Sequence, residues 1–374
     1  MQPKAKRMFY LDIARVVAII SITLNHAVNR SYRNYGGQME EFFAIPFGST
    51  LFKTLISVFS RIGVPLFLMI TGVLIMNKKM ENSSDIKRFY KHNLLSLLIT
   101  TEIWYVLMYW FLVLCAPNKA VVAERGWLGA VVGMFETMLF QNQVTMGSMW
   151  YMPMILCVYT TLPFVIIVKD KLAGSRDKVL YLPLVLMYTI GMLLPFLNNL
   201  LILLGKPIYE TPLQQHYLTT FYYLYIIGGY LVGQGALQKF KTPTVAAVAG
   251  VTFAVCFGYQ LWMYSRPADI LVSYDFPLMP ICTGFLLELL RRCAESFRKL
   301  ERPITYISRI AFGIYFVHIV IMTGLEEVLD RFAPSLPLPV RLILLETVSV
   351  GASIALILPL SKIKALKKYL FLIK

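Results

Sequence analysis

Long apolar stretches separated by short polar breaks recur along the whole chain. A helix that crosses a bilayer needs roughly 20 apolar residues. Backbone groups in lipid must be satisfied within the segment itself, which excludes open sheets. The pattern therefore predicts an all-α, polytopic integral membrane protein with about ten transmembrane helices. These predicted helices cover residues 8–29, 51–76, 93–115, 149–168, 179–201, 217–237, 244–264, 272–292, 305–328 and 338–361.

The composition supports this interpretation. Of the 374 residues, 57% are hydrophobic and 15% charged, and the mean hydropathy is +0.64. A soluble protein carries about a quarter charged residues. No polar segment resembles an appended soluble domain, so residues 1–374 are predicted to form one membrane-embedded domain. The five cysteines show no CxxC spacing, which favours neither a disulfide framework nor a metal site.

The formal net charge of +16 follows from where the cations lie. Segments on the side of the N-terminus hold 24 of the Lys and Arg residues, and segments on the other side hold 8. Cytoplasmic loops collect Lys and Arg. The asymmetry predicts that both termini are cytoplasmic, and no nucleic-acid partner is needed to explain the charge. The longest outer loop, residues 116–148, contains an apolar stretch that can lie along the interface or re-enter the membrane.

The first predicted helix carries three polar residues, Asp12, Arg15 and His26. A charge at membrane depth costs at least about 2.5–3.5 kcal/mol. Arg15 and His26 are separated by three turns plus about 20°, so they share a face and lie roughly 16 Å apart along the axis. Asp12 is one turn before Arg15 and can pair with it.

This polar stripe suits a long ligand that is charged at its cytoplasmic end, and acyl-coenzyme A has that shape. His26, as a neutral imidazole, can take a proton from a hydroxyl group that attacks a thioester. The alternative is purely structural, with the three side chains forming hydrogen bonds that hold helices together.

Arg61 and Glu102 are charged residues in the second and third predicted helices. Arg61 can stabilise the oxyanion that forms when a thioester carbonyl is attacked, or it can be an anchor that reaches the interface. Gly63 and Pro65 follow it and indicate a kinked, closely approached segment. Glu102 can pair with Arg61 or His26, or bind a sugar hydroxyl.

The third predicted helix begins with the cationic stretch "KRFYKHNLLSLL", which includes Lys87, Arg88 and Lys91. Clustered cations bind phosphate well, so these residues are candidates for the phosphates of the donor nucleotide. Cytoplasmic anchoring explains them equally well.

Aromatic and imidazole side chains mark two further helices. Trp150 and Tyr151 begin the fourth predicted helix, where an aromatic belt explains their position, although aromatic rings beside a cavity also bind sugars. Tyr315 and His318 lie three residues apart on one side of the ninth. We predict a substrate-binding role for these four residues and for Glu102. The alternative for His318 is a buried, hydrogen-bonded structural residue.

Four stretches, taken together and in this order, resemble the acyltransferase 3 family. They are "FYLDIARVVAIISITLNH", "RIGVPLFLMITGVLI", "MWYMPMILCVYTTLP" and "FGIYFVH". The resemblance covers nearly the whole chain. It implies a multi-pass protein of the plasma (inner) membrane of a bacterium, in contact with membrane lipid.

The resemblance also implies a reaction. The family transfers acetyl or other short acyl groups from cytoplasmic acyl-CoA to a hydroxyl of a cell-surface or lipid-linked glycan. Arg15 and His26 match the essential pair of the family, and Arg61 and Trp150 match further motif positions. The donor would then be acetyl-CoA or another acyl-CoA, bound as a substrate and not as a permanent cofactor.

Two positions depart from the family pattern. Thr71 replaces the usual Ser before Gly72, which keeps a hydroxyl, and His92 stands where relatives often have Arg. The sequence also lacks the fused esterase-like domain of some peptidoglycan-modifying members, which favours a lipid-linked oligosaccharide or exopolysaccharide acceptor. Two other functions remain open: a transporter or flippase of a lipid-linked sugar, and a membrane scaffold without a ligand.

Overall fold

The computed structural model describes residues 7–33, 42–115, 120–141, 147–171, 181–209, 221–266 and 271–373. Within these ranges the secondary structure is helical, with no β-strand. The chain divides into two compact units. The first unit comprises Met1–Lys78, Val168–Ser308 and Leu336–Ile343, and the second comprises Lys79–Ile167, Arg309–Ser335 and Leu344–Lys374.

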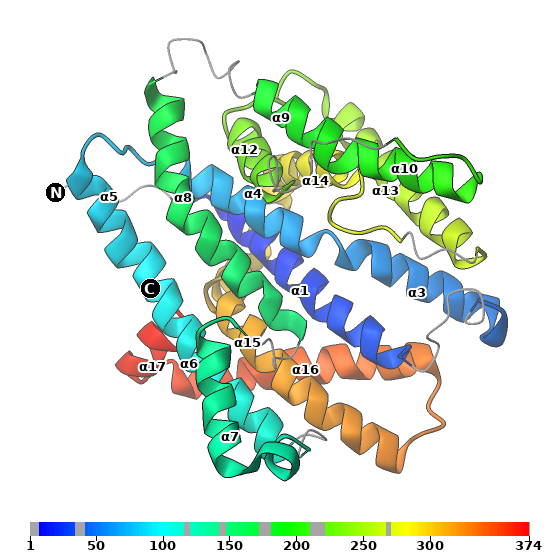
Figure 1. Cartoon of the computed structure of the whole chain (residues 1–374). Coiled ribbons are helices and arrows are strands. Elements are labelled where there is room, and N and C mark those ends of the chain that lie inside the picture. The colour runs from blue at the N-terminus through cyan, green and yellow to red at the C-terminus, as the bar shows by residue number, and fades with distance from the viewer. Residues whose placement is uncertain are drawn as a thin grey trace. The chain divides into compact units, whose positions relative to one another are not determined.

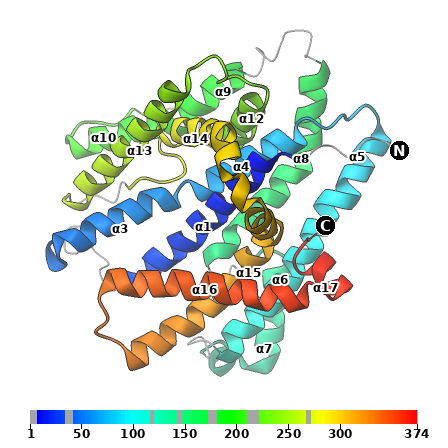
Figure 2. The same cartoon turned by 180° about the vertical axis from the view of Figure 1, so that it is seen from behind.

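In the first unit, helix α4 lies between α1 and α12 in both views (Figures 1 and 2). Helices α13 and α14 pack against each other, and α9 and α12 are in contact. The helices of this unit are α1 (Phe9–Ser31), α3 (Phe47–Ser60), α4 (Gly63–Ile75), α9 (Tyr181–Tyr188), α10 (Leu194–Leu203), α12 (Phe221–Gly233), α13 (Thr242–Tyr264) and α14 (Met279–Cys293).

In the second unit, α6 packs against α7 and α17. The helices that lie wholly within this unit are α5 (Ser83–Phe89), α6 (Leu95–Cys115), α7 (Ala120–Met138) and α17 (Lys364–Tyr369). Three longer helices contribute residues to both units, namely α8 (Tyr151–Lys171), α15 (Glu301–Phe332) and α16 (Leu338–Leu360).

Eight helical segments of the described chain are long and apolar enough to cross a membrane. One of them, Met279–Phe332, contains both α14 and α15, and α12 is a shorter apolar helix. The chain is therefore a multi-pass, all-helical membrane protein. Each of the ten predicted helices overlaps a helix of the structure. The number of ten crossings, the cytoplasmic position of both termini and the single domain stay predictions.

The helix predicted at 51–76 is divided in the structure into α3 and α4, which are joined by Arg61 and Ile62. Pro65 explains the break, because proline has no N–H to bond the carbonyl oxygen of Arg61, four residues earlier. Gly63 lets α4 approach α1 closely, since a Cβ at this position would lie 2.8 Å from the carbonyl oxygen of Ala18. The kink and the close approach expected from Gly63 and Pro65 are confirmed.

Two further differences concern the second unit. The helix predicted to begin at residue 93 is preceded by α5 and a π-helical turn, Tyr90–Leu94. Asn82 caps α5 by accepting hydrogen bonds from the backbone N–H groups of Ser84 and Asp85. Within the predicted loop 116–148, α7 consists of two helical parts that meet at a kink at Gly126. Large apolar residues just after the kink are exposed, among them Trp127 and Leu128.

Glycines hold α4 against α12. A Cβ at Gly72 would collide with the carbonyl oxygen of Ile226, and a Cβ at Gly229 would collide with the backbone of Met69. The two helix backbones are therefore in direct contact, which only residues without a side chain permit. Gly72 belongs to one of the four stretches that resemble the acyltransferase 3 family, and this contact gives it a structural role.

We expect Gly72→Ala and Gly229→Ala each to lower the free energy of unfolding by about 1–3 kcal/mol, because the added methyl group must force the helices apart. Gly250→Ala in α13 is the matched control, since its Cβ would meet no atom within 4 Å. The measurement is thermal unfolding of the detergent-solubilised protein. Equal melting temperatures for Gly229→Ala and Gly250→Ala would contradict the contact.

Candidate functional site

The carboxylate of Asp12 is the centre of a polar cluster at the start of α1. Its side chain is 1% exposed. Arg7 donates to it twice, from Nε at 2.6 Å and from Nη2 at 2.8 Å. Ser308 Oγ donates to Oδ1 at 2.6 Å, and Arg15 Nη1 lies 3.3 Å from the same oxygen. The predicted pair of Asp12 and Arg15 is confirmed, and Arg7 and Ser308 complete the set.

The cluster carries a net positive charge, because one carboxylate faces two guanidinium groups. A buried carboxylate is stable only when it is paired and hydrogen-bonded, and Asp12 also lies in the first turn of α1, where the helix dipole favours an anion. The hydrogen bonds from Arg7 to the Asp12 carboxylate raise the pKa of the Arg7 guanidinium above its ordinary value. Glu301 adds a further favourable electrostatic interaction with the Arg7 guanidinium.

The break between α3 and α4 places Arg61 beside the other end of α1. Ser60 Oγ donates to Asn25 Oδ1 at 3.2 Å, so the residues preceding Arg61 and His26 are in contact. His26 itself is half-buried on α1. The guanidinium of Arg61 lies 5.5 Å from the ring centroid of Tyr274, a cation–π geometry.

Tyr274 is held in place from α12. The hydroxyl of Tyr225, which is fully buried, donates to the carbonyl oxygen of Tyr274 at 2.5 Å. The next residue, Asp275, is hydrogen-bonded by the hydroxyl of Ser273. Arg61 therefore lies over a loop whose backbone is anchored and whose carboxylate is adjacent.

A small cavity of about 40 Å³ lies next to this loop and is lined by Asp275 and by Asn199 of α10, among other residues. Its size suits a single water molecule or hydroxyl group. The carboxylate and the amide are groups that can hydrogen-bond a hydroxyl there.

Aromatic rings gather in the second unit around Tyr315. Tyr151 meets the Tyr315 ring edge-on at a centroid distance of 5.9 Å, and Trp150 lies 6.1 Å from Tyr151. Phe316 lies 4.9 Å from Tyr315 and is stacked on Trp104 at 4.8 Å. Three predicted substrate-binding residues, Trp150, Tyr151 and Tyr315, are thus brought together.

The two other predicted substrate-binding residues are also in the second unit. His318 is fully buried, and its Nδ1 lies 2.8 Å from the carbonyl oxygen of Ile314, which can only accept. The hydrogen-bonded structural interpretation of His318 agrees with this contact. Glu102 has a buried Oε2 with no hydrogen-bond partner among the described residues.

The predicted phosphate-binding residues Lys87, Arg88 and Lys91 are exposed on α5 and the π-helical turn after it. They belong to the second unit, as does His92. None of the three forms an ion pair within the described part of the chain. They stay available for an anionic ligand.

The structure therefore groups the predicted residues by unit. Asp12, Arg15, His26 and Arg61 are all in the first unit, whereas the predicted sugar and phosphate residues are in the second. Sequence reasoning missed several partners of the first group, namely Arg7, Asn25, Ser60, Tyr274 and Ser308. Arg7 was used only as one of the cations that predict a cytoplasmic N-terminus, and Ser308 comes shortly before the "FGIYFVH" block. Neither residue has a spacing from Asp12 that predicts their contact.

Comparison with known proteins gives one match. The sequence model of the acyltransferase domain family matches residues 8–360, nearly the whole chain. The chain belongs to the acyltransferase 3 family. The curated proteins and the solved structures gave no match.

Membership makes the chain a membrane acyltransferase. The match includes every helix that carries a candidate site residue, from α1 to α15. In this acyltransferase, the first family block contains Asp12 and Arg15, which form an ion pair in the Asp12 cluster.

We expect Arg7→Met to lower the free energy of unfolding by about 1–2 kcal/mol, because Asp12 loses two hydrogen bonds while staying buried. This expected loss of stability is smaller than for a fully buried ion pair, because the Arg7 side chain is 42% exposed. The control is Lys79→Met, which removes an ion pair whose side chains are 84% and 68% exposed, and should change stability by less than about 0.5 kcal/mol. If thermal unfolding gives both variants the same stability, the Asp12 cluster does not hold α1.

Proposed function

We propose that the chain is an O-acyltransferase that moves an acetyl group from cytoplasmic acetyl-CoA to a hydroxyl of a cell-surface or lipid-linked glycan. The observation that carries this proposal is the helix α1, which in a member of an acyltransferase family presents Arg15 and His26 on one face. The membrane in question is the bacterial plasma membrane, and the acyl-CoA is a substrate.

The donor binds through its negative charges. The guanidinium groups of Arg7 and Arg15 attract phosphate groups, for which guanidinium geometry is well suited. The exposed cations Lys87, Arg88 and Lys91 supply further positive charge for the nucleotide. The pantetheine arm is slender and neutral, and it carries the thioester along α1 toward His26.

The reaction needs one base and one stabilised oxyanion. The imidazole of His26 accepts the proton of the acceptor hydroxyl while the oxygen attacks the carbonyl carbon of the thioester. The tetrahedral intermediate carries a negative charge on the former carbonyl oxygen, and Arg61 stabilises it. Collapse of the intermediate breaks the C–S bond, and the imidazolium returns the proton to the departing thiolate.

The acceptor sugar is recognised by hydrogen bonds and by aromatic faces. Trp150, Tyr151 and Tyr315 supply rings, and Glu102 supplies a polar group. Glu102 supports this role because its buried Oε2 has no hydrogen-bond partner among the described residues, and such an atom gains most from a hydroxyl donor.

His26→Ala is expected to lower kcat by about 10²–10⁴-fold, because the attacking hydroxyl loses its base. Acetyl-CoA should still bind, since the charged cluster at the start of α1 is intact. Asn29→Ala is the control on the same helix, at an exposed position. The measurements are release of free coenzyme A from acetyl-CoA in the presence of envelope extract, and calorimetric binding of acetyl-CoA. Unchanged turnover in His26→Ala would remove the mechanism.

Arg15→Ala is expected to weaken the binding of acetyl-CoA by about 10- to 100-fold, because a charged hydrogen bond to phosphate is lost. Arg331→Ala, an exposed arginine of α15, serves as the control for loss of one positive charge. Binding is measured by calorimetry on the purified protein. An unchanged dissociation constant in Arg15→Ala would assign that residue a structural role only.

A further inference from the structure

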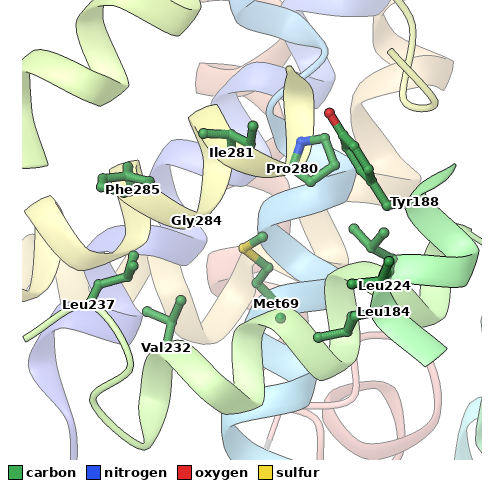
Figure 3. A pocket seen from close by; sticks show the side chains of 12 residues that line it. Met69, Leu184, Tyr188, Leu224, Val232, Leu237, Pro280, Ile281, Gly284 and Phe285 are labelled. Atoms are coloured by element: carbon green, nitrogen blue, oxygen red, sulfur yellow. The ribbon is translucent and has the colours of Figure 1, made fainter. Parts of the chain in front are cut away.

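A cavity of about 330 Å³ lies within the first unit between α4, α9, α12 and α14. Figure 3 shows Met69 of α4 pointing into it between Leu224 of α12 and Ile281 of α14. None of the residues assigned above to catalysis or to substrate binding lines this cavity. We call it the apolar pocket.

The chemistry of the apolar pocket excludes a polar occupant. Its lining side chains are hydrocarbon or thioether, with the hydroxyl of Tyr188 as their polar atom, and that hydroxyl points away from Met69 (Figure 3). A sugar or phosphate placed there would lose its hydrogen bonds to water without replacement, which costs several kcal/mol. A hydrocarbon chain loses nothing and gains about 0.8 kcal/mol per buried methylene.

Two glycines keep the apolar pocket open. At Gly228 and Gly284 the nearest atom to an added Cβ would be the terminal methyl group of Met69, at 3.9 and 3.7 Å, which is ordinary contact. Helix packing therefore does not require glycine at either position, in contrast to Gly72 and Gly229. A glycine inside a helix costs roughly 0.5–1 kcal/mol relative to alanine. What these two glycines provide is space.

The apolar pocket is reached from the lipid side of α9. No residue of α9 is buried, and Val185, which lines the pocket, is 58% exposed. In a membrane-spanning segment such a surface meets the hydrocarbon of the bilayer. A hydrocarbon chain of a surrounding lipid can therefore enter the apolar pocket without crossing a polar surface.

The same helical segment continues from the apolar pocket to a polar cavity. After Tyr188 come a π-helical turn and α10, whose Asn199 lines the cavity that contains Asp275. Tyr188 and Asn199 are eleven residues apart, with the π-helical turn Thr189–Leu193 between them. Asp275 follows Tyr274, over which Arg61 lies. One segment thus joins an apolar site to polar groups beside a candidate catalytic residue, an arrangement that matches an amphiphile.

We propose that the apolar pocket binds the hydrocarbon tail of a lipid-linked acceptor, while Asn199 and Asp275 contact a hydroxyl of its head group. This proposal rests on the proposed function, since it presumes a hydroxyl that accepts the acyl group. The pocket volume is at the lower end of ligand sites, so it holds a segment of the tail and the rest stays in the bilayer.

The test is photo-crosslinking of the full chain in phosphatidylcholine nanodiscs, without donor. The probe is decyl β-D-maltoside with a diazirine at the end of its alkyl chain. We expect labelled peptides that contain Met69 or Ile281. Gly284→Leu should reduce this labelling about tenfold or more, because its side chain fills the pocket. Gly250→Leu in α13 is the matched control and should label like the unchanged protein.

A second variant fills the pocket from its opposite wall, α9. It keeps the proposal testable if Gly284→Leu does not fold. Val185→Trp should also block labelling, whereas Leu186→Trp, at an exposed neighbour that does not line the pocket, should not. Labelling elsewhere, or labelling undiminished by both filling variants, would overturn the site. His26→Ala should label normally, so a failure of the proposed chemistry is distinguishable from a failure of this site.

The source of the tail is decided by a second probe, a phosphatidylcholine with a diazirine at the end of one acyl chain. We expect it to label the pocket less than the maltoside at equal concentration, and Asp275→Ala should abolish that preference. Equal labelling by both probes in the unchanged protein would make this an ordinary phospholipid site and overturn the acceptor assignment. A preference that survives Asp275→Ala would overturn the head-group contact.

Discussion

The buried carboxylate of Asp12 is the interaction on which the candidate site depends. It ties the segment before α1, the first turns of α1 and the beginning of α15 into one hydrogen-bonded group through Arg7, Arg15 and Ser308. Removing such a charge from water is costly, and the cost is recovered only when every partner is in place. The position of α1, and therefore of His26, follows from this arrangement.

A second constraint acts at the middle of the first unit. The backbone of α4 touches that of α12 at Gly72 and Gly229, and α4 touches α1 at Gly63. Arg61 is the C-cap of α3, and its backbone angles stay in the right-handed helical region. The contact at Gly63 holds the start of α4 close to α1, in keeping with the close packing of protein interiors.

The sequence predicted the helical architecture well because its signal is strong: apolar runs of membrane length can form only a few structures. It also predicted the kink from Gly63 and Pro65 and the pair of Asp12 and Arg15, since both depend on local spacing. The contact of Asp12 with Ser308 joins residues 296 positions apart, and that of Asn25 with Ser60 joins two helices. No periodicity encodes such contacts. A sequence also does not distinguish a glycine that contacts another backbone from a glycine that leaves a void.

The direct contact between α4 and α12 also limits how the first unit can move. No side chain separates the two backbones at Gly72 and Gly229, so α4 and α12 cannot approach each other further. Helix α9 buries none of its residues and continues into a π-helical turn, Thr189–Leu193, a feature that often accompanies functional sites in helices. Among the helices that line the apolar pocket, α9 is therefore the one with the least packing to hold it in place.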